Sequence, residues 1–119
     1  MYSIKVEASF SSAHNLRGYK GKCEELHGHN WKVEIIAADD KLDKSGMLLD
    51  FKYLKMKLND LLEKLDHTYL NNIPHFKKFN PTSENIAKYI YDNLKTEIHK
   101  LKSVTVWESE NSSATYYGK

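Results

Sequence analysis

A cysteine and two histidines lie close together in one short stretch of the chain. Cys23 is the only cysteine, and it stands four residues before a His27-Gly28-His29 sequence. Two histidines separated by one residue project from the same side of an extended strand, and neutral imidazoles are good zinc ligands. The thiol could be a further metal ligand or a reactive base held near the metal. The function of the protein depends on which of these it is.

A third histidine, His14, ends a segment in which apolar and polar residues alternate from residue 2 to residue 13. If the strands that end at His14 and begin at His27 are neighbours, all three imidazoles can meet. Three histidines with an open fourth position are typical of a catalytic zinc, whereas a structural zinc is normally closed by four protein ligands. Because His-x-His pairs are common by chance, the spacing alone also allows histidines that merely flank strand ends.

Cys23 has three interpretations at this point. It could close the zinc site as a fourth ligand, or it could be a thiolate beside the metal and Lys22, where positive charge would lower the pKa of the thiol. The third interpretation is a buried, inert cysteine. The charged neighbours Glu24 and Glu25 argue against full burial.

Two further groups could take part in chemistry. Asp66 precedes His67 at the end of a predicted helix, where a carboxylate can orient a general acid or base, although a histidine there is also favoured by the helix dipole alone. Glu108 follows two apolar residues on an inward strand face. A buried carboxylate needs a partner such as the N–H groups of a planar heterocycle, and the alternative is an exposed glutamate at a strand end.

The elements that must position these groups follow from the hydrophobic periodicity. Strands are predicted over residues 2–13 and about 27–38, and a C-terminal hairpin turns at residues 111–113. A first helix begins after the N-cap Asp50 and a second near Thr82-Ser83, with a break between them at residues 71–74. The apolar positions of the two helices recur every three or four residues: Phe51, Leu54, Leu58, Leu61, Leu62 and Leu65 in the first, and Ile86, Tyr89, Ile90, Leu94, Ile98 and Leu101 in the second.

This order predicts an α+β fold, ββααββ, in which a four-stranded antiparallel sheet carries both helices on one face. At 119 residues the chain is expected to be a single domain, 1–119. The 18 basic and 16 acidic residues form no block of like charge, so a nucleic-acid or membrane-surface role gains no support. With one cysteine, no signal peptide and no apolar stretch of transmembrane length, we expect a cytoplasmic protein.

Nine short motifs follow one another along nearly the whole chain: Phe10-Ser11-Ser12-Ala13-His14, Lys22-Cys23, Leu26-His27-Gly28-His29, Gly46-Met47, Asp50-Phe51, Leu65-Asp66-His67, Leu70-Asn71, Pro81-Thr82-Ser83-Glu84-Asn85 and Val106-Trp107-Glu108. In this order they resemble the 6-pyruvoyl-tetrahydropterin synthase superfamily. The three residues between Cys23 and His27 resemble its 6-carboxy-tetrahydropterin synthase branch, of queuosine biosynthesis.

The resemblance implies a zinc enzyme. His14, His27 and His29 would hold Zn²⁺, and Cys23 would be the thiolate that removes a proton. His67, assisted by Asp66, would be its acid/base partner.

The resemblance also implies the substrate contacts. Glu108 would anchor a pterin ring, helped by Thr82 and Ser83, and Arg17 and Lys22 are candidates to meet a triphosphate. The implied reaction converts 7,8-dihydroneopterin triphosphate to 6-carboxy-5,6,7,8-tetrahydropterin, with release of acetaldehyde and triphosphate. A 6-pyruvoyl-tetrahydropterin synthase, which only eliminates triphosphate, and a non-catalytic zinc- or pterin-binding module are the alternatives.

The fold implied is the tunnelling fold, in which subunits join their sheets into a barrel as a trimer or a dimer of trimers. The active sites then lie between subunits, so Cys23 and the Asp66-His67 pair would come from different chains of a homo-oligomer. Eight tyrosines, four phenylalanines and two tryptophans are many for one small core. Packing at subunit contacts would account for them, and so would an aromatic-rich core.

Overall fold

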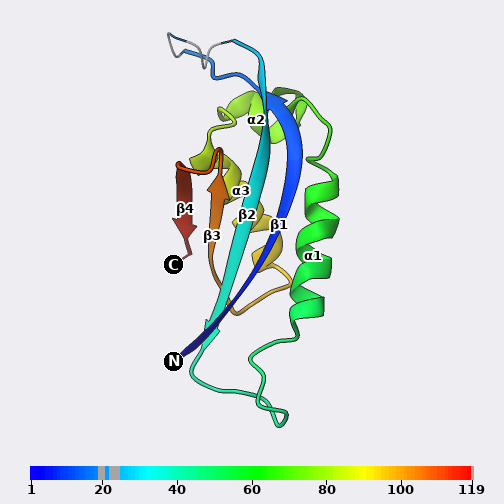
Figure 1. Cartoon of the computed structure of the whole chain (residues 1–119), viewed down its shortest axis with the longest axis vertical. Coiled ribbons are helices and arrows are strands. Elements are labelled where there is room, and N and C mark those ends of the chain that lie inside the picture. The colour runs from blue at the N-terminus through cyan, green and yellow to red at the C-terminus, as the bar shows by residue number, and fades with distance from the viewer. Residues whose placement is uncertain (19–20, 22–24, 119) are drawn as a thin grey trace.

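The computed structural model describes residues 1–18, 21 and 25–118, and it has the predicted α+β architecture. Four antiparallel strands form one sheet in the order β1-β2-β3-β4 (Figure 1). The strands are β1 Tyr2–His14, β2 His27–Asp39, β3 Leu101–Trp107 and β4 Ser113–Tyr117. Every connection between neighbouring strands is therefore either a direct hairpin or, between β2 and β3, the helical segment.

The two predicted helices are present, and a short third helix lies between them. The helical elements are α1 Phe51–Glu63, the 3-10 turn η2 Leu70–Asn72, α2 Pro74–Lys78 and α3 Ser83–Lys95. Asp50 caps α1 as predicted, because its side chain accepts a hydrogen bond from the backbone N–H of Lys52 at 2.9 Å. The chain breaks between the two long helices as predicted, but Pro74 begins the short helix α2, which was not predicted. Proline occupies the first turn of α2, where its missing N–H needs no hydrogen-bond partner. Phe76 of α2 is completely buried.

Helix α3 ends earlier than its apolar spacing predicted. Ile98 and Leu101 are buried as expected, but they lie in the turn after the helix and at the start of β3. The Lys95 ammonium group donates to the carbonyl oxygens of His99 and Leu101 at 2.6 and 3.0 Å. These bonds satisfy carbonyl groups where the helix stops and turn the chain into the sheet.

The core lies between the sheet and the helices. Helix α1 packs against β1, and α3 packs against β3 and β4 (Figure 1). Fully buried apolar side chains come alternately from the strands and periodically from the helices: Trp31, Val33, Ile35, Val104 and Val106 from the sheet, and Leu54, Leu58, Ile86 and Ile90 from the helices. Each such side chain contributes about 1.5–3 kcal/mol relative to exposure, so this layer fixes the face on which the histidines of the same strands must lie.

The β1–β2 pairing has one continuous register. It runs from Tyr2 opposite Asp39 to His14 opposite His27, and Ser12 lies opposite His29. The predicted alternation is therefore confirmed, and it brings the two strand ends that carry histidines side by side.

One end of the β1 edge is covered by the segment that follows α1. Ser11 donates its backbone N–H to Asp66 Oδ1 at 2.8 Å and accepts the backbone N–H of His67 at 2.6 Å. Ala13 donates its backbone N–H to the Thr68 carbonyl at 3.1 Å. None of the helices that the structure describes combines the length and apolar character needed to cross a bilayer.

Candidate active site

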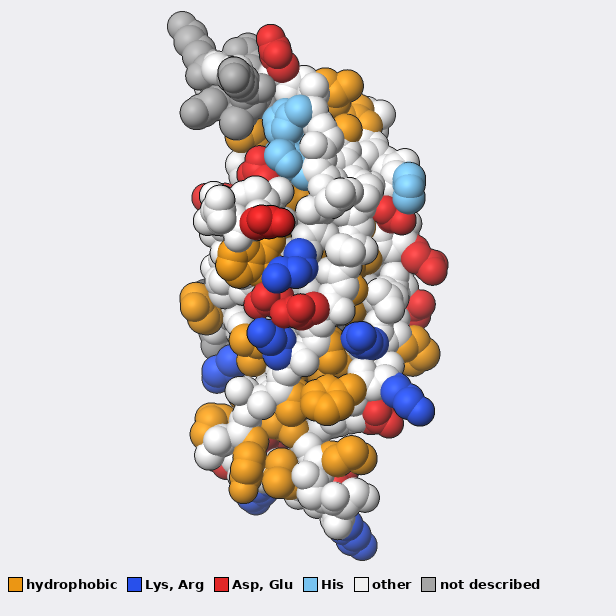
Figure 2. All heavy atoms as spheres, viewed as in Figure 1, with side chains coloured by type: hydrophobic (Ala, Val, Ile, Leu, Met, Phe, Trp, Pro, Cys, Tyr) orange, Lys and Arg blue, Asp and Glu red, His pale blue; other side chains and the backbone are white. Residues whose placement is uncertain are grey.

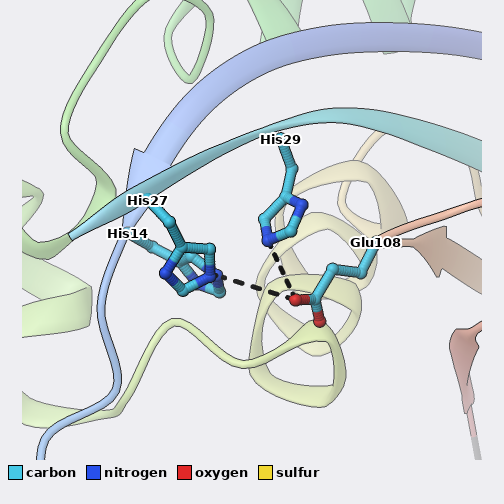
Figure 3. Close-up of side chains that lie close together, drawn as sticks. All are labelled: His14, His27, His29 and Glu108. Atoms are coloured by element: carbon cyan, nitrogen blue, oxygen red, sulfur yellow. Dashed lines mark hydrogen bonds and ion pairs between the residues drawn. The ribbon is translucent and has the colours of Figure 1, made fainter. Parts of the chain in front are cut away.

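The three predicted histidines and Glu108 converge at one end of the sheet (Figure 3). One ligand atom from each of His14, His27, His29 and Glu108 lies within 4.8 Å of the others. The Nε2 atoms of His14 and His27 are 2.9 Å apart, and His29 Nε2 is 2.9 Å from Glu108 Oε1. Four side chains from three separate parts of the sequence therefore form one potential metal centre.

The strand geometry explains this convergence. His14 and His27 are direct partners at the open end of the β1–β2 hairpin, and His29 lies on the same face of β2 because side chains alternate along a strand. Glu108 follows β3 immediately, and its backbone N–H donates to the Ser112 carbonyl at 3.1 Å, which closes the β3–β4 hairpin. In Figure 2 the visible histidine side chains lie in the upper part of the molecule, and the visible lysine and arginine side chains lie below them.

Backbone carbonyls orient two of the imidazoles. His14 Nδ1 lies 2.7 Å from the Pro81 carbonyl oxygen, and His27 Nδ1 lies 2.7 Å from the Glu25 carbonyl oxygen. A carbonyl can only accept, so each Nδ1 must carry the proton and donate it. The Nε2 lone pairs are thereby directed toward each other, which is the arrangement that metal-binding histidines commonly have.

The contact between these two Nε2 atoms needs a cation. Two lone pairs facing each other at 2.9 Å repel unless a proton or a metal ion lies between them. Burial lowers the pKa of His14, whose side chain is only 1% exposed, so a protonated imidazole is disfavoured there. A divalent metal ion meets the same need without protonating either ring.

His29 supports the same conclusion. Its Nε2 is buried and contacts Glu108 Oε1 at 2.9 Å, but it makes no hydrogen bond of good geometry within the described part of the chain. Burial lowers the pKa of His29, and the opposing attraction of Glu108 only partly offsets that effect. Neutral imidazoles and a carboxylate are a donor set that Zn²⁺ accepts, so the residues present fit the implied metal.

Glu108 links this cluster to the start of α3. Its second oxygen, Oε2, accepts a hydrogen bond from Ser83 Oγ at 3.4 Å, and its side chain is one-third exposed. The Thr82 hydroxyl caps α3 by accepting the backbone N–H of Asn85 at 3.0 Å. The structure thus brings Ser83 to Glu108 and gives Thr82 a role in starting the helix.

The Asp66–His67 pair lies apart from this cluster. His67 Nδ1 is 3.0 Å from Asp66 Oδ2, and the His67 side chain is 82% exposed. The pKa of Asp66 is lowered, first by the hydrogen bond from the Ser11 backbone and then by the contact with His67. Ser11 is three residues before His14 on β1, a separation of about 10 Å along an extended strand.

Of the candidates in the loop after β1, the structure describes only Arg17. Cys23 and Lys22 lie outside the described residues. Arg17 donates from Nη2 to the Phe76 carbonyl at 2.6 Å, and its backbone N–H donates to Asn80 Oδ1 at 3.0 Å. Arg17 therefore braces the loop after β1 against α2, a role that the sequence did not indicate.

Comparisons with known proteins identify the family. The family model described as 6-pyruvoyl tetrahydropterin synthase matches residues 3–119. A 6-carboxy-5,6,7,8-tetrahydropterin synthase from Synechocystis sp. is 39% identical over 123 residues, covering 98% of this chain and 94% of the relative. A putative 6-carboxy-5,6,7,8-tetrahydropterin synthase from Archaeoglobus fulgidus is 40% identical over 111 residues, covering 93% and 91%. The chain belongs to the 6-pyruvoyl tetrahydropterin synthase family.

The solved structures agree with this assignment. The 6-pyruvoyl tetrahydropterin synthase of Caenorhabditis elegans superposes with a TM-score of 0.91 at 30% identity, covering 99% of this chain and 96% of that one. The tunnelling fold predicted from the sequence is therefore confirmed, as is the resemblance on which it rested.

Proposed function

We propose that the protein is a zinc-dependent pterin synthase of the 6-carboxy-tetrahydropterin type. It would convert 7,8-dihydroneopterin triphosphate and one water molecule to 6-carboxy-5,6,7,8-tetrahydropterin, acetaldehyde and triphosphate. The observation that carries this proposal is the cluster of three imidazoles, two of them oriented by backbone carbonyls, beside the carboxylate of Glu108. The names of relatives at 39% and 40% identity favour this product.

His14, His27 and His29 would hold the metal through Nε2. When bound, zinc supplies a Lewis acid that polarises the side-chain oxygens of the substrate and acidifies the neighbouring C–H and O–H bonds. The low pKa of His14 and of His29 keeps these rings neutral, which is the form that binds metal.

Glu108 would bind the pterin ring. His29 Nε2 cannot serve a metal ion and Glu108 at the same time, so metal loading would free Glu108 Oε1 to accept a ring N–H. Ser83 already donates to Oε2 and would keep the carboxylate facing the open side. A carboxylate that accepts two parallel N–H groups recognises a flat, amide-like edge.

Cys23 and His67 would move the protons. Asp66 holds His67 by Nδ1 and is itself held by the Ser11 backbone, which leaves His67 Nε2 to give or take a proton at the substrate side chain. Cys23 would remove a proton as a thiolate, and Arg17 and Lys22 are candidates to receive the triphosphate.

The separation of these groups favours an active site made by two subunits. The exposed Asp66–His67 pair lies along the β1 edge, whereas the metal cluster lies at the hairpin end. Exposed apolar side chains also gather at the opposite end of the molecule (Figure 2), where Tyr2, Met47 and Phe51 line one hollow. A trimer or a dimer of trimers would bury such surface.

Product analysis tests the proposal. Zinc-loaded protein is incubated with 7,8-dihydroneopterin triphosphate, and the products are identified by mass spectrometry. We expect 6-carboxy-5,6,7,8-tetrahydropterin together with acetaldehyde and triphosphate.

The two alternatives give different results. A 6-pyruvoyl product without acetaldehyde would identify a 6-pyruvoyl-tetrahydropterin synthase, a function that the likeness to the Caenorhabditis elegans enzyme also favours. Bound zinc without any turnover would indicate a non-catalytic binding module.

A further inference from the structure

Two asparagine side chains hold the backbone that follows His14. Asn71 accepts the backbone N–H of Asn15 at 3.0 Å and donates to the Asn15 carbonyl at 2.9 Å. Asn80 does the same for Arg17, with distances of 3.0 and 2.8 Å. Each amide therefore exchanges two hydrogen bonds with one residue, as a neighbouring β-strand would.

Asn80 differs from Asn71 because it directly precedes Pro81, whose carbonyl contacts His14. The backbone carbonyl of Asn80 accepts the backbone N–H of Thr82 at 2.8 Å and the side-chain amide of Asn85 at 2.9 Å. The next carbonyl along the chain belongs to Pro81 and holds His14 Nδ1 at 2.7 Å. Because proline fixes its own φ and both neighbours are hydrogen-bonded, the direction of the Pro81 carbonyl is set from both sides.

We propose that Asn80 is a positioning residue of the metal centre, acting on His14 through the Pro81 carbonyl. This inference rests on the proposed metal site and identifies a residue that controls it. His14 is almost completely buried, and its ring direction depends on this carbonyl and on contacts with Trp31, His27 and His29. A carbonyl that turns away would leave the Nδ1–H without its partner and rotate Nε2 away from His27.

Asn71 provides a matched control. It exchanges the same two hydrogen bonds with the same loop, and it is buried, but it makes no contact with the Pro81 peptide among the described interactions. A general loosening of the loop would affect Asn71→Ala and Asn80→Ala alike. Asn80→Ala also releases the residue that precedes Pro81 from Arg17, so it should cause the larger loss of His14 orientation.

The experiment measures metal affinity in the whole 119-residue chain after its metal has been removed. Co²⁺ is titrated while its d–d absorption bands are recorded, and the Zn²⁺ affinity is measured by competition with a chromophoric chelator. We expect Asn80→Ala to bind Zn²⁺ about 10-fold more weakly, the lower end of the range for loss of a ligand's own hydrogen-bond partner, because Asn80 acts on His14 through Pro81. We also expect altered d–d bands, and an affinity within about threefold of the unaltered protein for Asn71→Ala.

A milder variant covers the case in which Asn80→Ala does not fold. Asn80→Asp keeps the acceptor for the Arg17 N–H but loses the donor, and it should still weaken Zn²⁺ binding and alter the d–d bands. Unchanged affinity and spectrum in a folded Asn80 variant would overturn the inference, as would an equal loss in Asn71→Ala. These titrations use no substrate, so a wrong reaction assignment cannot alter them. Failure of the unaltered protein to bind metal would instead contradict the proposed function itself.

Discussion

Two histidines of this molecule, His14 and His67, lie in opposite surroundings. His14 is almost fully buried and gives its Nδ1 proton to a backbone carbonyl. His67 is largely exposed, and its Nδ1 contacts the carboxylate of Asp66. Both rings are oriented through the same nitrogen, but the His14 ring is buried among other imidazoles and the His67 ring is exposed beside a negative charge.

The difference separates two kinds of chemistry. Burial lowers the pKa of His14 and of His29, which keeps them neutral and suited to a metal ion. The pKa of the Asp66 carboxyl is lowered, first by the hydrogen bond from the Ser11 backbone N–H, so this group stays ionised beside His67. The cluster around His14 therefore has the donor atoms for a cation, and we propose that the exposed Asp66–His67 pair exchanges protons.

Removing one buried ligand should have the largest effect. His14→Ala deletes the most buried imidazole and leaves two, so Zn²⁺ affinity should fall by more than about 100-fold, beyond the loss expected for an outer partner. Metal content is measured by mass spectrometry after dialysis. His99→Ala removes an exposed histidine and is the matched control. Retention of stoichiometric zinc in His14→Ala would show that the cluster is not the metal site.

Mixing two inactive variants tests the separation between the groups. If the buried cluster and the exposed pair serve one site from different subunits, Cys23→Ala and His67→Ala should each be inactive alone. Refolding them together should restore part of the activity, because some sites then receive both intact groups. Activity is measured as triphosphate release. Mixtures as inactive as either variant would place both groups in the same chain, and activity of His67→Ala alone would remove His67 from the reaction.

Glu108 lies at the border of the buried cluster, and its replacement sharpens where the metal site ends. Glu108→Gln keeps the shape but loses the charge, so KM should rise about 10–100-fold, the loss of a charged hydrogen bond to the substrate. Zinc content should not change. Glu110→Gln, an exposed neighbour, serves as the control. An unchanged KM would show that Glu108 does not bind the substrate. Loss of zinc would show that it is a metal ligand.

The neutral state of His14 and His29 predicts that the stability of the metal-free protein depends on pH, an effect smaller than those above. The lowered pKa means that the unfolded chain, with histidines near 6.5, binds more protons than the folded chain at mildly acidic pH. The stability of the metal-free protein should therefore fall as the pH drops below about 6.5. The fall is read from Tm, which shifts on the order of 4 °C for each kcal/mol. His14→Ala should show a shallower fall, and an identical profile would contradict the neutral assignment.

The sequence predicted which histidines meet, but not the backbone carbonyls that orient them. Strand alternation was enough to place His27 and His29 on the face of Trp31, because one side of the sheet must be apolar. The carbonyls of Pro81 and Glu25 could not be predicted, since every residue has a carbonyl and only the fold decides which one faces an imidazole. The helix at Pro74 was missed because proline can both break a helix and begin one.

The sequence identified Asp66 and His67 as a candidate pair but did not predict where the pair lies in the fold. The sequence put Asp66 and His67 at the end of a helix, whereas α1 ends at Glu63 and the pair belongs to the segment that follows the β1 edge. Hydrogen bonds to Ser11 link residues far apart in the sequence, and no local pattern reports them. The sequence named Arg17 as a candidate for triphosphate binding, but its hydrogen bond to the Phe76 carbonyl could not be predicted because it depends on α2.

The most direct test of the account is the metal content and turnover of Cys23→Ala. If three imidazoles hold the metal and the thiol only moves a proton, the variant should bind one zinc per chain with unaltered affinity while triphosphate release collapses. Both quantities are measured on the same preparation, beside the unaltered protein. Loss of stoichiometric zinc would make Cys23 a ligand of a closed site, and full turnover would remove it from the chemistry.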